Sequence, residues 1–370
     1  IVYALLVISA LLFGFATRIA GLKISGTLVT LSFCLAFAWR TEGNPENPAW
    51  SNANHVPFWA AANFNGVEGM REGGVLYEIA DAVRGTPGRL SHDLHVGNEM
   101  LGSSRVFEVM PHLADKPILE GGIVNSALGS LAAYTVQGEV SDSTAGFPLI
   151  VKPRSFDPES GLRHLEFMGV RHFVARSRRV HEAFAADAGW RLKAAFGGGK
   201  WKLFESNMES TSLVRVWNSR LPAFETKKPQ HDLLEWMYVP GAVETPAILL
   251  WDTDEVAMEV ASNDDYLAWL ATATTNAVPK AGWLDKVSRP CEDAVVSEDG
   301  TVRFTTDAVG QPHVVAVSYY PEWRVRGAEQ VYFVTPGYIA VFPTENNVEL
   351  YLAKSFAQRC GEMLGIAGLL

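Results

Sequence analysis

The chain has few cysteines and no concentrated run of basic residues, and each shortage excludes a class of protein. Only three cysteines occur among 370 residues, so the sequence contains no disulfide framework. Acidic residues outnumber basic ones by 41 to 31, which gives a net charge of −10. Nucleic-acid binding needs clustered positive charge, and the densest basic patch is confined to residues 176–179. We therefore exclude nucleic acid as a partner.

Motifs for catalysis, phosphate binding and metal binding are also missing. The sequence has no G-x-S-x-G elbow, and Gly197–Gly199 is interpreted as a hairpin turn because no GK[ST] ending follows it. His92, His95 and His112 invite a metal site, but an offset of three on a strand sends His92 and His95 to opposite faces. We expect no metal and no cofactor, and no catalytic residue is identified.

Long apolar runs are confined to the ends of the chain. Residues 1–40 are predicted to form two membrane helices with a short cytoplasmic link. Residues 1–17 carry no charge, and seventeen apolar residues are about the shortest run that can cross a hydrocarbon core roughly 30 Å thick. Arg18 and Lys23 lie in that link, so the positive-inside rule places the following residues on the far side of the membrane. Residues 354–370 are expected to begin a further membrane helix. The alternative is that these runs are buried amphipathic helices of a soluble protein.

The residues between these ends predict an α+β fold. Residues 41–70 are expected to form a loop, and residues 71–217 an extracytoplasmic α/β layer domain in which strands and helices alternate. Residues 218–293 are treated as a connector in which PAILLW looks like a strand, DDYLAWLATAT a helix and KPQHDLL a loop. Residues 294–353 contain five short runs of period two, which predict a small juxtamembrane antiparallel β domain.

Individual elements of the α/β layer can be placed from periodicity and capping. We predict helices over residues 75–83, 104–112 and 123–136, and a further helix capped by Asp157 and Pro158. The predicted strands are GRLSHDLH, VRHFVA, WRLKAAF and KWKLFES.

One segment of this layer has the composition of a pocket-lining chain. Between Leu94 and Ser130 the sequence interleaves five glycines with polar residues, of which Asn98, Glu99, Glu120 and Asn125 are candidate ligand-binding residues. The alternative is that the glycines only serve turns and helix ends.

Aromatic side chains concentrate in residues 317–343, VSYYPEWRVRGAEQVYFVTPGYIAVFP. Strand alternation places Val315, Val317 and Tyr319 on one face and the intervening residues on the other, so about half of the rings are expected in a core. Tyr320 and Trp323 are the candidates for stacking on a ligand such as a sugar.

Two blocks of the chain resemble a family of bacterial membrane proteins said to carry a 6-pyruvoyl-tetrahydropterin-synthase-related domain. The first block is residues 88–122 with LRHLEFMGVRHFVARS and WKLFES, and its leading strand begins at Arg89, a further candidate for ligand binding. The second block, residues 302–343, resembles the juxtamembrane β segment of that family through Gly310, Pro312, Ser318, Tyr319, Pro321, Trp323, Gly327 and Pro336.

The resemblance implies a glycosyltransferase-like protein of the GT-C class in the bacterial inner membrane. Such proteins combine many membrane helices with an extracytoplasmic, here periplasmic, domain and use a polyprenyl-phosphate sugar donor. Their catalytic acidic residue lies in a first extracytoplasmic loop, which is expected to lie outside this chain. The expected partners are the lipid bilayer and a polyprenyl-phosphate sugar or envelope polysaccharide. The alternative function is a non-catalytic, membrane-anchored scaffold or accessory subunit that binds a protein partner or an envelope polysaccharide.

Overall fold

The computed structural model describes residues 66–119, 128–143, 155–208, 212–251, 259–273, 278–291, 293–297 and 299–369. The chain divides into two units, Ile1–Met70 and Arg71–Leu370, which are treated separately. Only Gly66–Met70 of the first unit is described, and it contains the short helix η1 (Val67–Gly69). The two membrane helices predicted over residues 1–40 and most of the loop predicted over residues 41–70 therefore lie outside the described residues.

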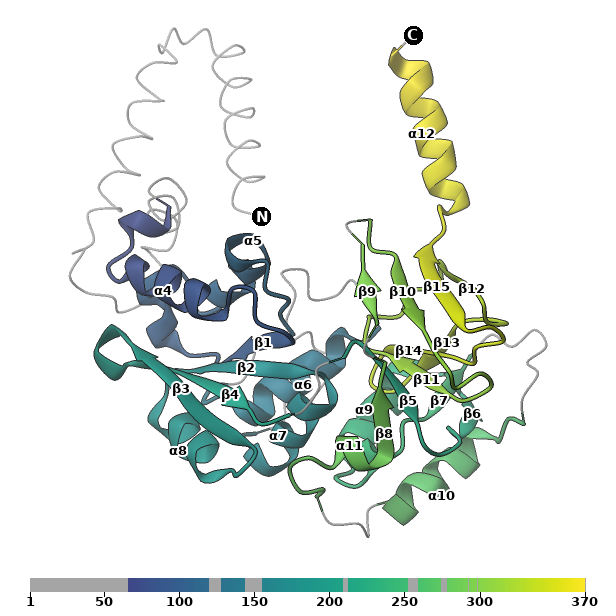
Figure 1. Ribbon diagram of the computed structural model, residues 1–370, viewed down its shortest axis with the longest axis horizontal. Helices are drawn as coiled ribbons and strands as arrows, with labels where there is room; N and C mark the ends of the chain where they lie inside the picture. Colours follow the sequence, from purple (N-terminus) through teal and green to yellow (C-terminus); the bar gives the residue numbers. More distant parts are fainter. Residues whose placement is uncertain are drawn as a thin grey trace, which may run out of the picture. The chain divides into compact units, whose positions relative to one another are not determined.

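The second unit begins with a four-stranded sheet in the order β1-β2-β4-β3 (Figure 1). Its strands are β1 (Arg89–His92), β2 (Val170–Ala175), β3 (Trp190–Phe196) and β4 (Trp201–Ser206). β1 and β2 run parallel, whereas β4 is antiparallel to both β2 and β3. Gly197–Gly199 makes the turn between β3 and β4, and Gly198 has a φ of 67°. The predicted strands VRHFVA, WRLKAAF and KWKLFES and the glycine hairpin turn are confirmed, whereas GRLSHDLH is a strand only over Arg89–His92 and His95 is the N-cap of η2 (Val96–Leu101).

Helices cover both faces of this sheet, with α4 on one side and α7 and α8 on the other (Figure 1). Their bounds are α4 (Gly73–Val83), η2 (Val96–Leu101), η3 (Val106–Val109), α5 (Met110–Ala114), α6 (Ser130–Val140), α7 (Pro158–Phe167) and α8 (Arg178–Ala186). The predicted apolar stripe of α4 is buried, and the Asp157 carboxylate caps α7 by accepting the N–H of Ser160 at 3.4 Å. The helix predicted over residues 104–112 is instead the 3-10 turn η3 followed by the short helix α5, which has Pro111 in its first turn.

A seven-stranded sheet in the order β6-β7-β13-β14-β11-β5-β8 forms the next layer. Its neighbours are antiparallel except β6 and β7. The strands are β5 (Val214–Trp217), β6 (Ala223–Glu225), β7 (Ile248–Leu250), β8 (Ser288–Pro290), β11 (His313–Val315), β13 (Tyr332–Val334) and β14 (Tyr338–Val341). Residues 218–293, which we predicted as a connector, therefore supply three strands to the same sheet as residues 313–341.

The described residues of the connector segment also include four helices, of which α9 and α10 are the longest. Their bounds are α9 (Pro229–Met237), η5 (Ala242–Glu244), α10 (Asn263–Ala273) and α11 (Leu284–Val287).

A smaller sheet, in the order β12-β15-β10-β9, packs against one face of the large one. Its strands are β9 (Val295–Val296), β10 (Val302–Thr305), β12 (Trp323–Arg326) and β15 (Asn347–Leu352). Val216, Val315 and Ile339 of the large sheet share a core with Phe304 and Leu350 of the small one. β11 ends at Val315, so the strand alternation that we expected to continue through Val317 and Tyr319 does not apply there.

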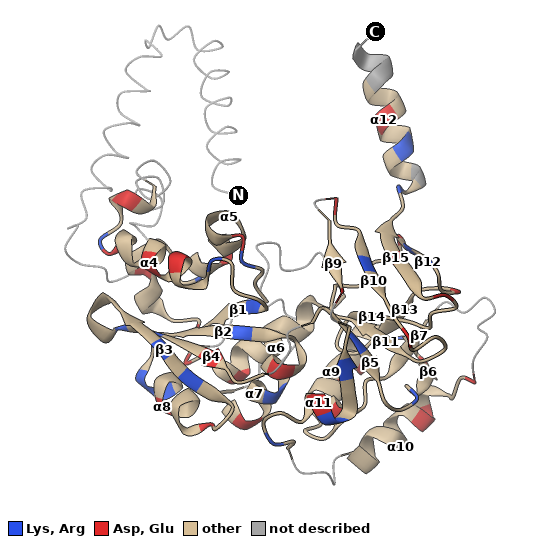
Figure 2. Ribbon diagram, in the orientation of Figure 1, with Lys and Arg blue, Asp and Glu red and all other residues tan. Residues whose placement is uncertain are grey.

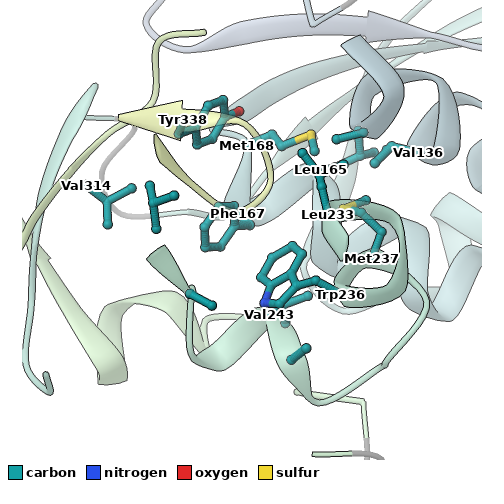
Figure 3. Close-up of a cluster of buried hydrophobic side chains, with 14 of the residues drawn as sticks. Val136, Leu165, Phe167, Met168, Leu233, Trp236, Met237, Val243, Val314 and Tyr338 are labelled. Atoms are coloured by element: carbon teal, nitrogen blue, oxygen red, sulfur yellow. The ribbon is translucent and has the colours of Figure 1, made fainter. Parts of the chain in front are cut away.

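The opposite face of the large sheet shares its core with the first layer. Phe167, the last residue of α7, lies 5.7 Å from Trp236 and 6.1 Å from Tyr338, measured between ring centroids (Figure 3). The buried cluster around it includes residues from α6, α7, β2, α9 and β14. Residues 71–217 and the β-rich remainder thus form one α+β body with a continuous core.

Helix α12 (Phe356–Leu369) follows β15 at the end of the chain. Among the described residues, no helix combines the length and apolar character needed to cross a membrane.

Candidate ligand-binding cavity

A cavity of about 530 Å³ opens between the first sheet and the large sheet. That volume is within the range of roughly 300–1,000 Å³ typical of small-molecule sites. The cavity is lined by β1, the loops around α5, the first turns of α6, the segment after β11, and the ends of β14 and β15. The lining residues include two arginines and four aromatic side chains, namely Arg89, Arg105, Tyr134, Tyr320, Trp323 and Tyr338.

Arg89 links the two layers at the edge of the cavity. Its Nη1 donates to the carbonyl of Met168 at 2.6 Å, and its Nη2 donates to the carbonyl of Ala316. Its guanidinium carbon lies 5.9 Å from the centroid of the Tyr338 ring. Figure 2 shows the basic segment on β1. No carboxylate of the described residues forms an ion pair with Arg89, so its positive charge is not neutralised by a described acidic group.

Arg105 precedes η3 and lies on another wall. It forms an ion pair with Glu108, and its guanidinium carbon lies 5.4 Å from the centroid of the Tyr134 ring. Burial alone favours loss of its proton, but Glu108 and the Tyr134 hydroxyl outweigh burial and raise the pKa of Arg105. The buried Nη2 atom of Arg105 has no hydrogen-bond partner in the described part of the chain.

Tyr338 contributes a second unused donor. The residue is 8% exposed, its ring stacks on Phe167, and its hydroxyl has no hydrogen-bond partner among the residues described. Burial raises the pKa of Tyr338, so the phenol stays protonated and remains a donor.

Helix α6 begins at the cavity. Its N-cap residue, Gly129, makes no side-chain cap, and Ser130, Ala132 and Ala133 line the cavity wall. The start of α6 lies directly against the turn between β13 and β14: a Cβ atom on Gly337, which has a φ of 110°, would lie 2.2 Å from the Cα of Gly129. Only glycine permits this contact between the two backbones. The positive end of the α6 dipole is thereby held beside Tyr338.

Three of the predicted site residues line this one cavity. Arg89, Tyr320 and Trp323 come from segments that are far apart in sequence. Trp323 is 5% exposed, and its indole N–H donates to the carbonyl of Ser318 at 3.0 Å, so most of this ring belongs to the core of the small sheet. Tyr320 is half-buried and presents more of its ring.

The other predicted residues are placed elsewhere or lie outside the described residues. Asn98 is buried, where its Nδ2 donates to the carbonyl of Asp93 at 2.8 Å and its Oδ1 accepts the Trp201 indole N–H at 3.0 Å. It therefore secures η2 against β4. Glu99 lies in η2 and is not among the described lining residues. Glu120 and Asn125 lie outside the described residues.

Sequence reasoning missed Arg105, Tyr134 and Tyr338. Arg105 belongs to the glycine-rich segment that we predicted to line a pocket. It directly follows Gly102 and two serines, and this position was the one sequence signal that could have marked it as a binding residue. Tyr338 follows Pro336 and Gly337 but resembles any other strand aromatic. Tyr134 carries no signal in the sequence, because its position depends on how α6 packs.

The histidines form no metal centre within the described ranges, where no group of three or more His, Cys, Asp or Glu side chains is placed to hold an ion. His92 is fully buried, its ring lies tilted at 48° to the Phe107 ring with centroids 5.4 Å apart, and burial lowers its pKa to about 4.

Comparisons with protein families, with curated proteins and with solved structures found no match to this chain.

Proposed function

We propose that the chain is the extracytoplasmic part of a multi-span, glycosyltransferase-like protein of the bacterial inner membrane, and that its cavity binds the sugar of a polyprenyl-phosphate ligand. The observation that carries this proposal is the convergence of Tyr134, Tyr320, Trp323 and Tyr338 with two arginines on one cavity. Aromatic rings offer an apolar face to a sugar ring, while tyrosine and arginine supply hydrogen bonds to its hydroxyl groups.

The position of the cavity relative to α12 supports a lipid-linked ligand. Leu352, the last residue of β15, lines the cavity, and α12 begins at Phe356. Met363 and Leu364 of α12 are 63% and 73% exposed. In our proposal α12 continues as a membrane helix, residues 1–40 form two more, and the cavity lies on the periplasmic side near the bilayer. The domain then binds the ligand, and the catalytic acidic group lies in another part of the protein.

A transfer assay on the intact protein in lipid nanodiscs tests this function. We expect transfer from a polyprenyl-phosphate sugar, with Tyr320→Ala raising the KM for the donor about tenfold because one stacking contact is lost. Tyr351→Ala is the matched control, since Tyr351 is also half-buried and stacks under Arg326 on the small sheet, away from the cavity. Absence of transfer with every donor, together with retained binding to a protein or polysaccharide, would favour the scaffold instead.

A further inference from the structure

The described lining of the cavity favours an anionic ligand. It includes Arg89 and Arg105 but no aspartate or glutamate. Glu108 balances the charge of Arg105 from outside the lining, whereas Arg89 has only carbonyl groups as described partners. Among the described residues, an anion in the cavity therefore meets the positive charge of Arg89 without an acidic group paired to it.

Two buried donors in the lining have no acceptor among the described residues. These are the Tyr338 hydroxyl and the Nη2 atom of Arg105. Buried polar atoms in folded proteins are almost always paired, so these two donors, which no described residue satisfies, are the groups on this cavity that a ligand oxygen would pair with. A ligand with several acceptor oxygens satisfies both.

The first turn of α6 adds backbone donors at the same place. Helix α6 has eleven residues, and its N-cap residue, Gly129, has no side chain to accept its first N–H groups, although the Ala132 N–H donates to the Gly129 carbonyl at 3.1 Å. Gly337 touches Gly129, so the neighbouring Tyr338 lies beside the start of the helix. Arg105 reaches the second turn of α6 through its contact with Tyr134. Helix starts of this kind bind phosphate and carboxylate groups through their N–H groups and dipole.

We propose that the cavity contains a phosphate subsite formed by Arg105, the Tyr338 hydroxyl and the first turn of α6, with Arg89 supplying long-range attraction. Donors that approach from a loop, a strand and a helix suit a tetrahedral anion better than a planar carboxylate. The rest of the ligand extends along Ile118, Leu119, Tyr320 and Leu352, which also line the cavity. The subsite is argued from the cavity alone, whereas the identity of its ligand as a polyprenyl-phosphate sugar rests on the proposed function.

Isothermal titration calorimetry on the full chain in nanodiscs tests the subsite with three probes: inorganic phosphate, a soluble sugar 1-phosphate and a short-chain polyprenyl phosphate. Tyr338→Phe removes one oxygen that has no described partner, so the fold is retained. We expect this variant to weaken binding of phosphate-bearing probes about tenfold, the effect of one hydrogen bond to a charged group. Tyr332→Phe is the matched control, because Tyr332 is a buried tyrosine of the adjacent strand β13 and does not line the cavity among the described residues.

A second variant keeps the test independent of one side chain. The pair Arg105→Gln with Glu108→Gln removes the guanidinium without leaving a buried carboxylate alone, and we expect it to weaken phosphate binding at least tenfold. Tighter binding of the polyprenyl probe than of the soluble probe would identify a lipid-linked ligand, and equal binding would identify a soluble sugar phosphate; both support the subsite.

The outcomes separate the two proposals. If the wild-type chain binds none of the three probes, or if Tyr338→Phe and the paired variant bind them as tightly as wild type, the phosphate subsite is wrong even where sugar transfer is observed. If phosphate binding is lost in both variants but the intact protein transfers no sugar, the subsite stands and the glycosyltransferase proposal fails.

Discussion

Arg89 donates a hydrogen bond from its Nη2 atom to the backbone carbonyl of Ala316, and so joins the first strand of one sheet to the segment that leaves β11 of the other. Its Nη1 atom bonds Met168 at the end of α7. The same residue therefore stabilises the junction of the two layers and places positive charge at the cavity.

Replacement of Arg89 tests the structural half of this role. Arg89→Ala removes two charge-assisted hydrogen bonds, and we expect the free energy of unfolding to fall by about 2–4 kcal/mol in urea titrations followed by circular dichroism. Arg84→Ala, which removes an arginine whose ion pair with Asp81 is exposed, is expected to change stability by less than about 0.5 kcal/mol. Equal losses in the two variants would contradict the role given to Arg89.

The backbone contact between Gly129 and Gly337 gives a second prediction. Gly337→Ala introduces a methyl group where there is no room for one, and it also strains a backbone with a φ of 110°. Gly300→Ala is the control, because Gly300 has a φ of 80° but open space around it. We expect Gly337→Ala to destabilise the protein by about 1–3 kcal/mol more than Gly300→Ala, measured as the difference in free energy of unfolding. No difference would show that α6 does not start against this turn.

A buried carboxyl group predicts the pH dependence of stability. Burial raises the pKa of Glu166 from 4.5 to about 7, although Arg163 and the N–H of Leu284 oppose this effect. The folded state thus holds the Glu166 proton more tightly than the unfolded state does. Its contribution to stability is fully present below about pH 4.5 and is lost as the pH rises through about 7.

Glu166→Gln keeps the shape of the side chain and removes this titration. We expect the variant to be more stable than wild type at pH 8, by on the order of 3 kcal/mol, with the difference shrinking towards zero near pH 4.5. Urea unfolding at several pH values between 4.5 and 8 measures the two curves. Parallel curves for the two proteins would show that Glu166 is not the titrating group.

The sequence predicted long elements well and very short ones poorly. The strands VRHFVA, WRLKAAF and KWKLFES are six or seven residues long and each contains aromatic residues; a helix separates the first two, and a glycine turn separates the last two. β7 lies within PAILLW, which was predicted as a strand, whereas β6 and β8 have only three residues each, too few to show a period, and are strands because they pair within the large sheet. Residues 218–293 therefore had the composition of a connector but supply part of a layer.

The candidate site shows the same limit. Arg89, Tyr320 and Trp323 could each be selected from local patterns, but their convergence depends on the packing of two sheets that no local pattern encodes. Asn98 was selected for polarity in a glycine-rich segment, and that polarity instead satisfies the Trp201 indole N–H and a backbone carbonyl. Polar residues that serve buried hydrogen bonds and those that serve ligands look alike in a single sequence.

Photo-crosslinking of the intact protein in nanodiscs tests the central claim most directly. A polyprenyl-phosphate sugar carrying a photoreactive group on the sugar would be irradiated with the protein, and the labelled peptides identified by mass spectrometry. We predict labelling of peptides that contain residues 130–134 and 316–323, competed by unlabelled ligand and reduced by Tyr338→Phe. Labelling confined to other surfaces, such as the groove lined by Val295, Arg303 and Glu349 on the small sheet, would contradict the assignment of the cavity as the ligand site.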